Sequence, residues 1–241
     1  MIDAAVSFQD LTVRYADRAA VYGVSATIAT GSLTALIGPN GAGKSTLLNA
    51  VTRLKPVTQG RVILGPHIEG RIAYLPQQSV LDRSFPINVL DLAALGAWQR
   101  TGASGRIGGQ ELQRAYDALR TVGLMGLERR PIGALSAGQL QRALFARVLM
   151  QDAQLILLDE PFNAVDARTT LDLLNILRRW HAEGRTVVAV LHDLEQVRTH
   201  FGHALLLTRQ CIACGSTAAV LTQGNLARAR KMAESWGDSV R

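Results

Sequence analysis

The segment GPNGAGKST at residues 38–46 constrains the fold of this chain more than any other feature. It matches the pattern G-x-x-x-x-G-K-[ST], in which glycines let backbone N–H groups wrap an anion that side chains would keep away. The apolar run LTALIG (33–38) before it predicts a buried strand. The segment STLLNAVTRL (45–54) after it predicts a helix, one face of which carries Leu47, Leu48, Val51 and Leu54. A strand, a glycine-rich loop and a helix in this order predict a phosphate-binding loop.

The chemistry of this loop predicts ATP and Mg²⁺ as cofactors. Lys44 can reach the β and γ phosphates, and the hydroxyl of Ser45 can bind Mg²⁺. The N-terminus of the following helix adds partial positive charge. An ordinary glycine-rich turn is the alternative, and the strand before the loop and the helix after it disfavour that alternative. The other residues of the predicted ATP-binding segment are Gly38, Pro39, Asn40, Gly41, Ala42, Gly43 and Thr46.

The order of apolar patterns predicts an α/β fold with a mostly parallel sheet. Runs typical of strands recur at RIAYLP (71–76), QLILLDE (154–160) and RTVVAVLHD (185–193). The segment ARTTLDLLNILRRWHAEG (167–184) predicts a helix between the last two. Strands that alternate with helices favour a parallel sheet covered on both faces. The first segment alternates polar and apolar residues and predicts half-buried strands.

The middle of the chain predicts a helical lobe inserted in this α/β core. INVLDLAALGAW (87–98) and QELQRAYDALRTVGL (110–124) have the spacing of amphipathic helices, and a glycine-rich segment joins them. We expect one domain over residues 1–241. Its α/β core is predicted at residues 1–78 and 151–241, and its helical lobe at about 79–150.

Polar residues end several of the predicted strands, where open α/β sheets bind ligands. Asp159 is a candidate Mg²⁺ ligand, and Glu160 is a candidate base that orients or deprotonates water. His192 could contact the γ phosphate, and Gln77 could sense Mg²⁺ or water and report to the lobe. Taken singly, each has a structural alternative: a helix cap for the acids, a satisfied histidine, and a polar surface glutamine.

Composition limits the class of protein but not its chemistry. The 241 residues are 48% hydrophobic and 19% charged, so a large core is expected and disorder is not. The formal net charge of +7 suits nucleic acid, an anionic membrane surface or nucleotide, and the scattered arginines also fit a solvated surface. The start lacks a signal-peptide pattern, and no run reaches the roughly 18 apolar residues of a membrane span. We expect a soluble, cytoplasmic protein that can dock on a membrane protein.

Two cysteines, Cys211 and Cys214, form a CxxC pair that is compatible with a metal or redox site. No second ligand pair with metal-site spacing lies nearby. The surrounding segment HALLLTRQCIACGST (203–217) predicts a strand, a turn and a strand. We therefore favour the interpretation in which both cysteines are small apolar fillers.

Three further segments belong with these motifs: Tyr15, LSAGQ (135–139) and NAVD (163–166). Taken together, they resemble the motifs of the ATP-binding subunits of ABC transporters, over nearly the whole chain. The resemblance implies a P-loop NTPase core with N-terminal antiparallel strands and an inserted helical subdomain. It also implies ATP hydrolysis, with Glu160, His192 and Gln77 as catalytic residues and Ser45, Gln77 and Asp159 at the Mg²⁺ that accompanies ATP. The segments that carry it are Tyr15, GPNGAGKST, Gln77, LSAGQ (135–139), LILLDE, NAVD (163–166) and His192.

The resemblance further implies that this chain works as a homodimer when ATP is bound. In the family, the signature segment of one subunit closes over the ATP held by its partner. By this resemblance Tyr15 stacks on adenine, and Asp166 contacts the other subunit. Two residues depart from the commonest pattern: Ala137 stands where glycine is usual, and NAV precedes Asp166. The signature residues are Leu135, Ser136, Ala137, Gly138 and Gln139.

The segment DRSFPINVLDLAALG (82–96) is most similar to zinc and manganese uptake ATPases. This resemblance implies a peripheral subunit on the cytoplasmic face of the membrane, bound to integral membrane permeases and acting indirectly with an extracytoplasmic metal-binding protein. One alternative is import of siderophore or cobalamin-type chelates, because those importers share the FP-x-x-V pattern. The other is a soluble, nucleic-acid-associated ABC ATPase. We do not expect nucleic acid as a partner, because no sustained heptads separate Ser45 from Ser136 and the chain holds one ATPase unit.

Overall fold

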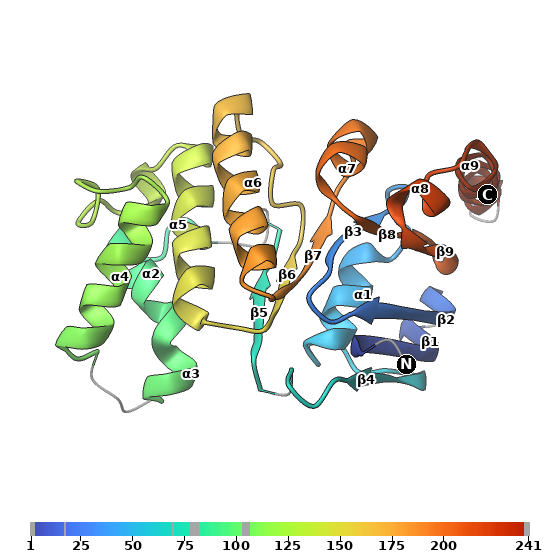
Figure 1. The fold of residues 1–241 in the computed structure, drawn as a ribbon, viewed down its shortest axis with the longest axis horizontal. Helices are drawn as coiled ribbons and strands as arrows, with labels where there is room; N and C mark the ends of the chain where they lie inside the picture. The colour runs from blue at the N-terminus through green and yellow to red at the C-terminus, as the bar shows by residue number, and fades with distance from the viewer. Residues whose placement is uncertain (1–2, 17, 69, 78–81, 103–106, 239–241) are drawn as a thin grey trace.

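The structure is a computed structural model that describes residues 3–16, 18–68, 70–77, 82–102 and 107–238 (Figure 1). Within these residues a six-stranded sheet has the order β5-β6-β7-β3-β8-β9, and a three-stranded antiparallel sheet has the order β2-β1-β4. The large sheet is parallel except for the pair β8 and β9. The predicted fold class is confirmed. The strands are β1 Ala4–Tyr15, β2 Arg18–Ala29, β3 Leu33–Ile37, β4 Gln59–Leu64, β5 Ile72–Leu75, β6 Leu155–Leu158, β7 Thr186–Val190, β8 His203–Thr208 and β9 Gln210–Ser216.

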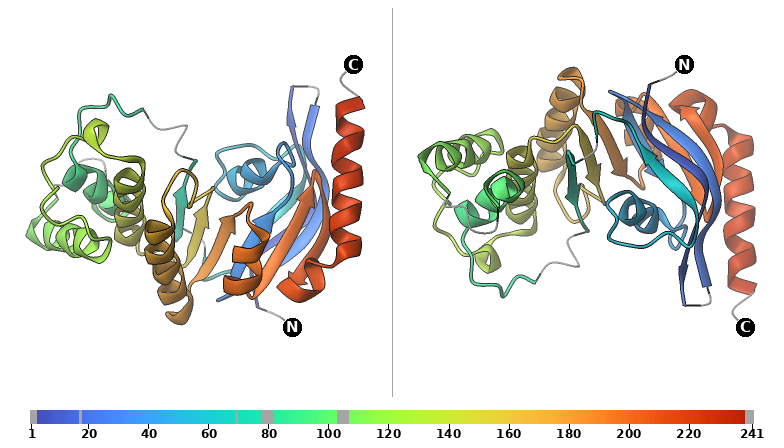
Figure 2. Two further views of the ribbon diagram at one scale, coloured as in Figure 1. Left: turned by 90° about the horizontal axis from the view of Figure 1, so that it is seen from above. Right: turned by 90° about the horizontal axis from the view of Figure 1, so that it is seen from below.

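Helices cover both faces of the large sheet. Helix α1 (Lys44–Val51) lies between the two sheets, and α6 (Ala167–Ala182) lies on the opposite face of the large sheet (Figure 2). Helices α7 (Leu194–His200), α8 (Thr217–Val220) and α9 (Gln223–Asp238) complete the core. Strands β3, β6 and β7 are buried along their whole length, which explains why they read as continuous apolar runs rather than as alternating ones.

The described residues between β5 and β6 form helices and no strand, as the sequence predicts. These helices gather at the end of the molecule opposite α9 (Figures 1 and 2). The predicted start of the helical lobe, at residues 79–81, lies outside the described residues. The helices are α2 Val89–Ala94, the short 3₁₀ turn η2 Leu95–Ala97, α3 Trp98–Thr101, α4 Gly109–Thr121, the 3₁₀ turn η3 Ile132–Ala134 and α5 Ala137–Gln151.

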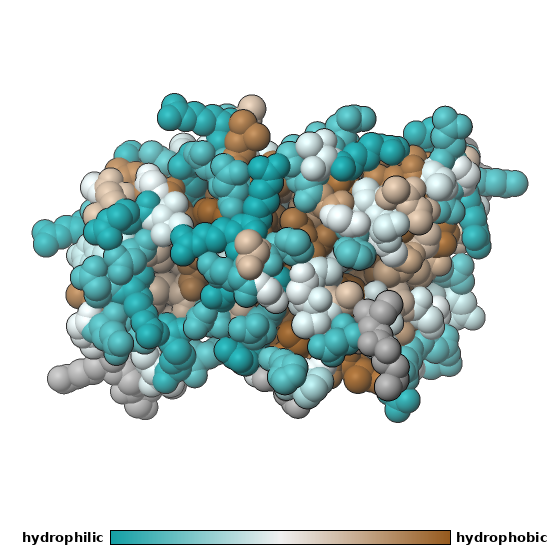
Figure 3. Space-filling view, viewed as in Figure 1, coloured by the Kyte–Doolittle hydropathy of each residue, from teal (hydrophilic) through white to brown (hydrophobic). Residues whose placement is uncertain are grey.

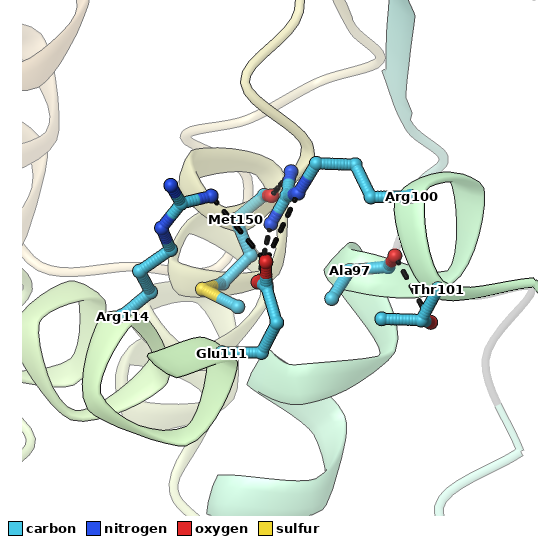
Figure 4. Close-up of polar contacts among 6 residues, drawn as sticks. All are labelled: Ala97, Arg100, Thr101, Glu111, Arg114 and Met150. Carbon is cyan, nitrogen blue, oxygen red and sulfur yellow. Dashed lines mark hydrogen bonds and ion pairs between the residues drawn. The ribbon is translucent and has the colours of Figure 1, made fainter. Parts of the chain in front are cut away.

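A small polar network ties these helices together (Figure 4). The Arg100 guanidinium on α3 donates to the Met150 carbonyl oxygen near the end of α5 and to the carboxylate of Glu111 on α4. Arg114 also contacts Glu111. The hydrogen bond from Arg100 holds the pKa of Glu111 below its usual value, against the opposing effect of burial. Arg100 therefore links α3, α4 and α5 through hydrogen bonds.

One apolar core runs without interruption from these helices to the sheet. It contains Leu119 of α4 and Leu144 of α5 as well as Leu158 of β6 and Ala189 of β7. The α5 and α6 helices meet through the rings of Phe145 and Trp180, which stack with their centroids 5.8 Å apart. A second core fills the space between α1 and the two sheets. Helix α5 is thus anchored to the sheet by packing, not by one loop.

Two local expectations need correction. Leu54 does not join the apolar face of α1, because the helix ends at Val51 and Arg53 adopts a left-handed φ of 60°. Leu54 is 67% exposed, whereas Leu47, Leu48 and Val51 are buried as predicted. The alternation of β1 is also interrupted: a bulge at Asp10, with a φ of 49°, shifts the register between Phe8 and Leu11.

The cysteine segment forms the predicted strands β8 and β9, but the cysteines differ in exposure. Cys211 is half-buried and packs against the second core, whereas Cys214 is exposed, so the filler interpretation is wrong for Cys214. Burial raises the pKa of the Cys211 thiol to about 11.

Hydrophilic residues cover most of the face in Figure 3, with hydrophobic patches between them. Within the described part of the chain, no helix is long and apolar enough to cross a membrane.

Candidate functional site: a nucleotide-binding edge of the sheet

Neighbouring strands of the large sheet carry the predicted site residues at their carboxyl ends. Gln77 follows β5, Asp159 and Glu160 follow β6, and His192 follows β7. The loop 38–43 follows β3, the next strand in the sheet. Because these strands are parallel, their carboxyl ends meet at one edge (Figure 1). Strand order therefore brings together residues that are far apart in the sequence.

Glycines in the loop are required by close packing as well as by backbone conformation. Gly43 has a φ of 90°, and a Cβ there would lie 2.4 Å from Val21 Cγ1 on β2. A Cβ on Gly38 would lie 2.0 Å from the Leu207 carbonyl oxygen on β8. No larger side chain fits at either position without backbone movement. The loop is thus held against strands β2 and β8.

Lys44 lies over its own loop. Its Nζ donates to the carbonyl oxygens of Gly38, at 2.9 Å, and Pro39, at 3.0 Å. The residue is only 6% exposed. Burial lowers the pKa of Lys44, and the negative charges of Glu160 and Asp159 oppose that shift. A buried cation whose hydrogen bonds go to neutral carbonyls is well suited to receive a phosphate.

Asp159 is buried beside the loop, and one of its carboxylate oxygens lacks a hydrogen bond. Its exposure is 2%, and Oδ1 has no hydrogen-bond partner among the described residues. Oδ2 accepts from the Tyr74 hydroxyl at 3.5 Å. Burial raises the pKa of Asp159, while a hydrogen bond from Ser45 opposes that rise. An unpaired buried carboxylate oxygen next to a serine hydroxyl matches the hard oxygen ligands that Mg²⁺ prefers.

Glu160 is held by donors from three separate segments of the described chain. Gln77 Nε2 donates to Oε2 at 2.9 Å, and Asn163 Nδ2 donates to the same oxygen at 3.1 Å. His192 Nε2 lies 2.8 Å from Oε1, and because a carboxylate accepts, the ring nitrogen donates. The Glu160 backbone has a left-handed φ of 52°. The three predicted catalytic residues thus form one hydrogen-bonded group.

These residues open on a common pocket of about 570 Å³. Asn40 of the loop lines it, so the phosphate-binding segment and the Glu160 group share one cavity. The pocket is lined by Asn40, Gln77, Glu160, Phe162, Asn163, Val190, Leu191, His192, Asp193 and Gln196. Its volume falls within the range typical of small-molecule sites.

The signature segment lies elsewhere. Ser136 caps α5: its Oγ accepts from Gln139 N at 3.2 Å, and its own N–H donates to Gln139 Oε1 at 3.1 Å. Leu135 is buried, and Ser136 is exposed. None of the residues 135–139 lines the pocket with Glu160. Ala137 occupies the first turn of the helix, where a methyl group is compatible with helical structure.

Asp166 uses its carboxylate within its own helix. It caps α6, accepting from Thr169 N at 2.8 Å and from Thr169 Oγ1 at 2.9 Å. These hydrogen bonds hold the pKa of Asp166 below its usual value. A Cβ on Gly138 would lie 3.7 Å from Asp166 Oδ2, so the signature and this cap are neighbours in one chain. The predicted contact of Asp166 with another subunit stays a prediction.

Tyr15 is the last residue of β1 and does not line the pocket that contains Glu160. Its ring is 46% exposed and lies under Lys55, whose Nζ is 4.0 Å from the ring centroid. A partly exposed aromatic face with a cation above it is compatible with a stacked base. Stacking on adenine stays a prediction.

Sequence patterns did not reveal two residues of this site. Tyr74, which contacts Asp159, reads as an ordinary aromatic residue of strand β5. Asn163 was recognised only as part of the NAVD motif and not as a partner of Glu160. The one available signal was the position of Asn163 three residues after Glu160, in a turn where Asn163 N donates to the Glu160 carbonyl oxygen.

Comparison with known proteins agrees with this geometry. The family model described as ABC transporter matches residues 21–163. A probable metal transport system ATP-binding protein of Chlamydia pneumoniae is 43% identical over 215 residues, covering 88% of this chain and 83% of that one. The manganese transport system ATP-binding protein MntB of Listeria monocytogenes is 40% identical and covers 90% and 92%. The zinc transport system ATP-binding protein TroB of Treponema pallidum is 39% identical and covers 93% and 86%.

Solved structures give the same result. The chain matches an inward-facing metal-chelate type ABC transporter with a TM-score of 0.82 and 28% identity, covering 92% of this chain and 87% of the other. It matches a dimeric bacterial ABC transporter cassette with a TM-score of 0.77 and 26% identity, covering 88% and 98%. The chain therefore belongs to the ABC transporter family as an ATP-binding subunit. It is an ATPase, and its hydrolysis of ATP is coupled to transport, as predicted.

Proposed function

We propose that this chain powers the import of a transition-metal ion, zinc or manganese, through separate membrane subunits. The relatives named for manganese and for zinc transport support this cargo, at 40% and 39% identity. The observation that supports turnover is the Glu160 carboxylate, held by Gln77, Asn163 and His192 in the pocket that Asn40 also lines. A site that only bound nucleotide would not need an oriented carboxylate at this place.

In this mechanism Glu160 is the base. Its Oε1 and Oε2 are fixed by donors, so the carboxylate can orient an attacking water and accept its proton without reorganising. Lys44 leaves the carbonyl oxygens of Gly38 and Pro39 and binds the β and γ phosphates. His192, which donates to Glu160, would contact the γ phosphate as the water attacks. Positioned acid–base groups contribute roughly 10² to 10⁴ in rate.

Mg²⁺ fits the residues beside the loop. Oδ1 of buried Asp159, which no described donor contacts, and the Ser45 hydroxyl would hold it, and Gln77 lies close through its contact with Glu160. When bound, the ion neutralises charge on the phosphate oxygens. Asp159 then has a charged partner in place of an unpaired buried oxygen, which removes a cost of burial.

We propose a head-to-tail homodimer in the ATP-bound state. Ser136 and the N-terminus of α5 are outside the pocket of their own chain, so they are free to close over the nucleotide of a partner. The similarity to a dimeric cassette supports this arrangement. Tyr15 would stack on the adenine, and Asp166 would lie at the contact between subunits.

The membrane subunits would bind a groove between the helices and the core. This groove, of about 350 Å³, includes Leu54, Tyr74 and Gln99 among its lining residues. Leu54 and, next to Gln99, Trp98 are exposed, at 67% and 56%. Large exposed apolar side chains beside a groove favour a protein partner. Such binding would place the chain at the cytoplasmic face of the membrane, and an extracytoplasmic metal-binding protein would act through the permease.

Metal accumulation by cells tests the cargo. In cells that lack the endogenous chain, wild-type protein is expected to restore uptake of radioactive zinc or manganese, and Glu160→Gln is expected to fail because the base is removed. Glu183→Gln serves as a matched control, since Glu183 pairs with Arg179 and Arg185 away from the pocket. If cells that lack the chain take up zinc and manganese normally but no longer take up siderophores or cobalamin, the cargo is a metal chelate. Salt-sensitive DNA binding without a co-purifying membrane protein would favour a nucleic-acid role.

The purified protein tests the base and the dimer together. Glu160→Gln keeps the hydrogen-bonding shape of the side chain but cannot accept a proton. With Mg²⁺ and ATP it is expected to release phosphate at least about a hundredfold more slowly and to elute as a dimer. A Glu160→Gln protein that stays monomeric and hydrolyses ATP at the wild-type rate would contradict the assignment.

A further inference from the structure

Tyr74 occupies a junction between two parts of the site. Its phenol hydroxyl donates to Asp159 Oδ2 at 3.5 Å, and its backbone carbonyl oxygen accepts from Arg147 Nη2 at 3.0 Å. Asp159 carries the candidate Mg²⁺ carboxylate, and Arg147 lies on α5, the helix that begins at the signature. One residue of β5 therefore contacts both the metal ligand and the signature helix.

Arg147 is a partly buried cation whose guanidinium donates to a neutral carbonyl oxygen. Burial lowers the pKa of Arg147, and no described carboxylate forms an ion pair with it. Its Nε is buried without a partner among the described residues. Removing such a charge from water is costly unless hydrogen bonds or an ion pair compensate for the lost hydration. That hydrogen bond goes to the Tyr74 carbonyl oxygen, so it fixes the backbone of β5 at this position.

A second donor, Gln77, follows the end of this strand, three residues after Tyr74. Tyr74 donates to Asp159, and Gln77 donates to Glu160. The two acceptors are consecutive residues after β6. The backbone supports this alignment, because Tyr74 pairs with Leu157 in parallel register and Asp159 N donates to the Leu75 carbonyl oxygen at 2.9 Å. The end of β5 thus presents one donor to each of the two adjacent carboxylates.

The two oxygens of Asp159 have different surroundings. Tyr74 occupies Oδ2, while Oδ1 is buried and has no hydrogen-bond partner among the described residues. A donor on one oxygen limits rotation of the carboxylate and leaves the other oxygen to face a cation. Hydrogen bonds of this kind orient metal ligands in many proteins, and losing one typically weakens metal affinity by roughly 10- to 100-fold.

We propose that Tyr74 is a positioning residue that aims the Asp159 carboxylate at Mg²⁺ and is itself held in place by Arg147 of the signature helix. The inference depends on the proposed role of Asp159 as a Mg²⁺ ligand. It adds a physical connection within one chain between the helix that closes on a partner's nucleotide and the metal site of its own. Movement of α5 would change the position of Tyr74 and with it the orientation of Asp159.

Mn²⁺ binding to the nucleotide-loaded protein tests this role without relying on turnover. Mn²⁺ replaces Mg²⁺, its free concentration is followed by electron paramagnetic resonance, and a non-hydrolysable ATP analogue is present at saturation. Tyr74→Phe keeps the ring and removes the hydroxyl. It is expected to weaken Mn²⁺ affinity about tenfold while leaving analogue affinity in EDTA unchanged. Tyr22→Phe is the matched control, because Tyr22 is 53% exposed on β2.

Asp159→Asn separates the two hypotheses. If Asp159→Asn binds Mn²⁺ as tightly as wild type, the proposed metal ligand is wrong. If Asp159→Asn weakens Mn²⁺ and Tyr74→Phe behaves as wild type, the metal ligand stands and the positioning role of Tyr74 is overturned.

Arg147→Met tests the connection to α5, because methionine keeps an apolar stem and removes the donor. It is expected to weaken Mn²⁺ affinity in the same direction as Tyr74→Phe. The double variant is expected to lose less than the product of the two single losses, since both act through the same carboxylate. An Arg147→Met protein that melts at a lower temperature but binds Mn²⁺ as wild type does would overturn the connection.

Discussion

Single residues at this site are held in place by hydrogen bonds within the chain. Lys44 is bound by two carbonyl oxygens of its own loop, and Glu160 is bound by three side chains in the described structure. Asp159 differs, since its buried Oδ1 has no hydrogen-bond partner within the part of the chain that the structure describes. The groups expected to bind phosphate and water are thus oriented by hydrogen bonds, whereas the group expected to bind a cation has a buried oxygen that no described donor contacts.

Replacing Lys44 tests the phosphate assignment at this scale. Lys44→Ala removes a buried charge whose hydrogen bonds to a phosphate are worth about 1.5–3 kcal/mol each. ATP affinity, measured by titration calorimetry, is expected to fall at least about tenfold. Lys231→Ala on α9 is the control, because Lys231 is an exposed lysine outside the pocket. Equal ATP affinity in Lys44→Ala and wild type would remove the loop from the binding site.

Helices α2 and α5 both begin with a capping box. Comparing the two caps separates helix stability from function. Ser136 starts α5 and Asn88 starts α2, each with a reciprocal hydrogen bond to the side chain three residues later. Asn88 caps α2, which precedes α5 in the helical lobe, and it has no predicted role at the nucleotide. The two caps therefore contribute alike to helix stability but differ in expected function.

Alanine substitutions at these caps are expected to separate the two properties. Ser136→Ala and Asn88→Ala should each lower the free energy of unfolding by about 1 kcal/mol, measured by chemical denaturation. In the Glu160→Gln background, only Ser136→Ala is expected to weaken the ATP-dependent dimer on gel filtration, because only Ser136 would face a partner's phosphate. Loss of the dimer in both variants, or in neither, would contradict the signature assignment.

At the scale of the whole molecule, a continuous core joins the helices to the sheet. The stacked rings of Phe145 on α5 and Trp180 on α6 lie within it and are both nearly inaccessible. A lobe that shares its core with the sheet transmits a displacement of α5 to the strands that carry the site. The same packing predicts that the two parts unfold together.

Phe145→Ala tests this cooperativity. The variant is expected to lose about 3–5 kcal/mol of stability, because a large buried ring leaves a cavity. Tryptophan fluorescence and circular dichroism are expected to report a single transition in denaturant for both the variant and wild type. Phe85→Ala is the control, as Phe85 is 57% exposed. A separate early transition of the helices would show that the lobe is an independent folding unit.

Local patterns account for much of the fold. Strands β3, β6 and β7 and helix α6 were predicted because each forms an uninterrupted apolar or amphipathic run. Leu54 was assigned wrongly, because the left-handed Arg53 that ends α1 has no signature in an apolar periodicity. The bulge at Asp10 appears in the sequence only as a change of phase between Phe8 and Leu11.

The sequence by itself determined the phosphate loop, since its glycines, lysine and serine act within nine consecutive residues. It also determined which residues end the buried strands. Only the tertiary structure decided which distant donors hold each carboxylate: Gln77 and His192 for Glu160, and Tyr74 for Asp159. The physical reason is that these contacts depend on β5, β6 and β7 lying side by side, and strand order arises from packing between segments distant in the chain.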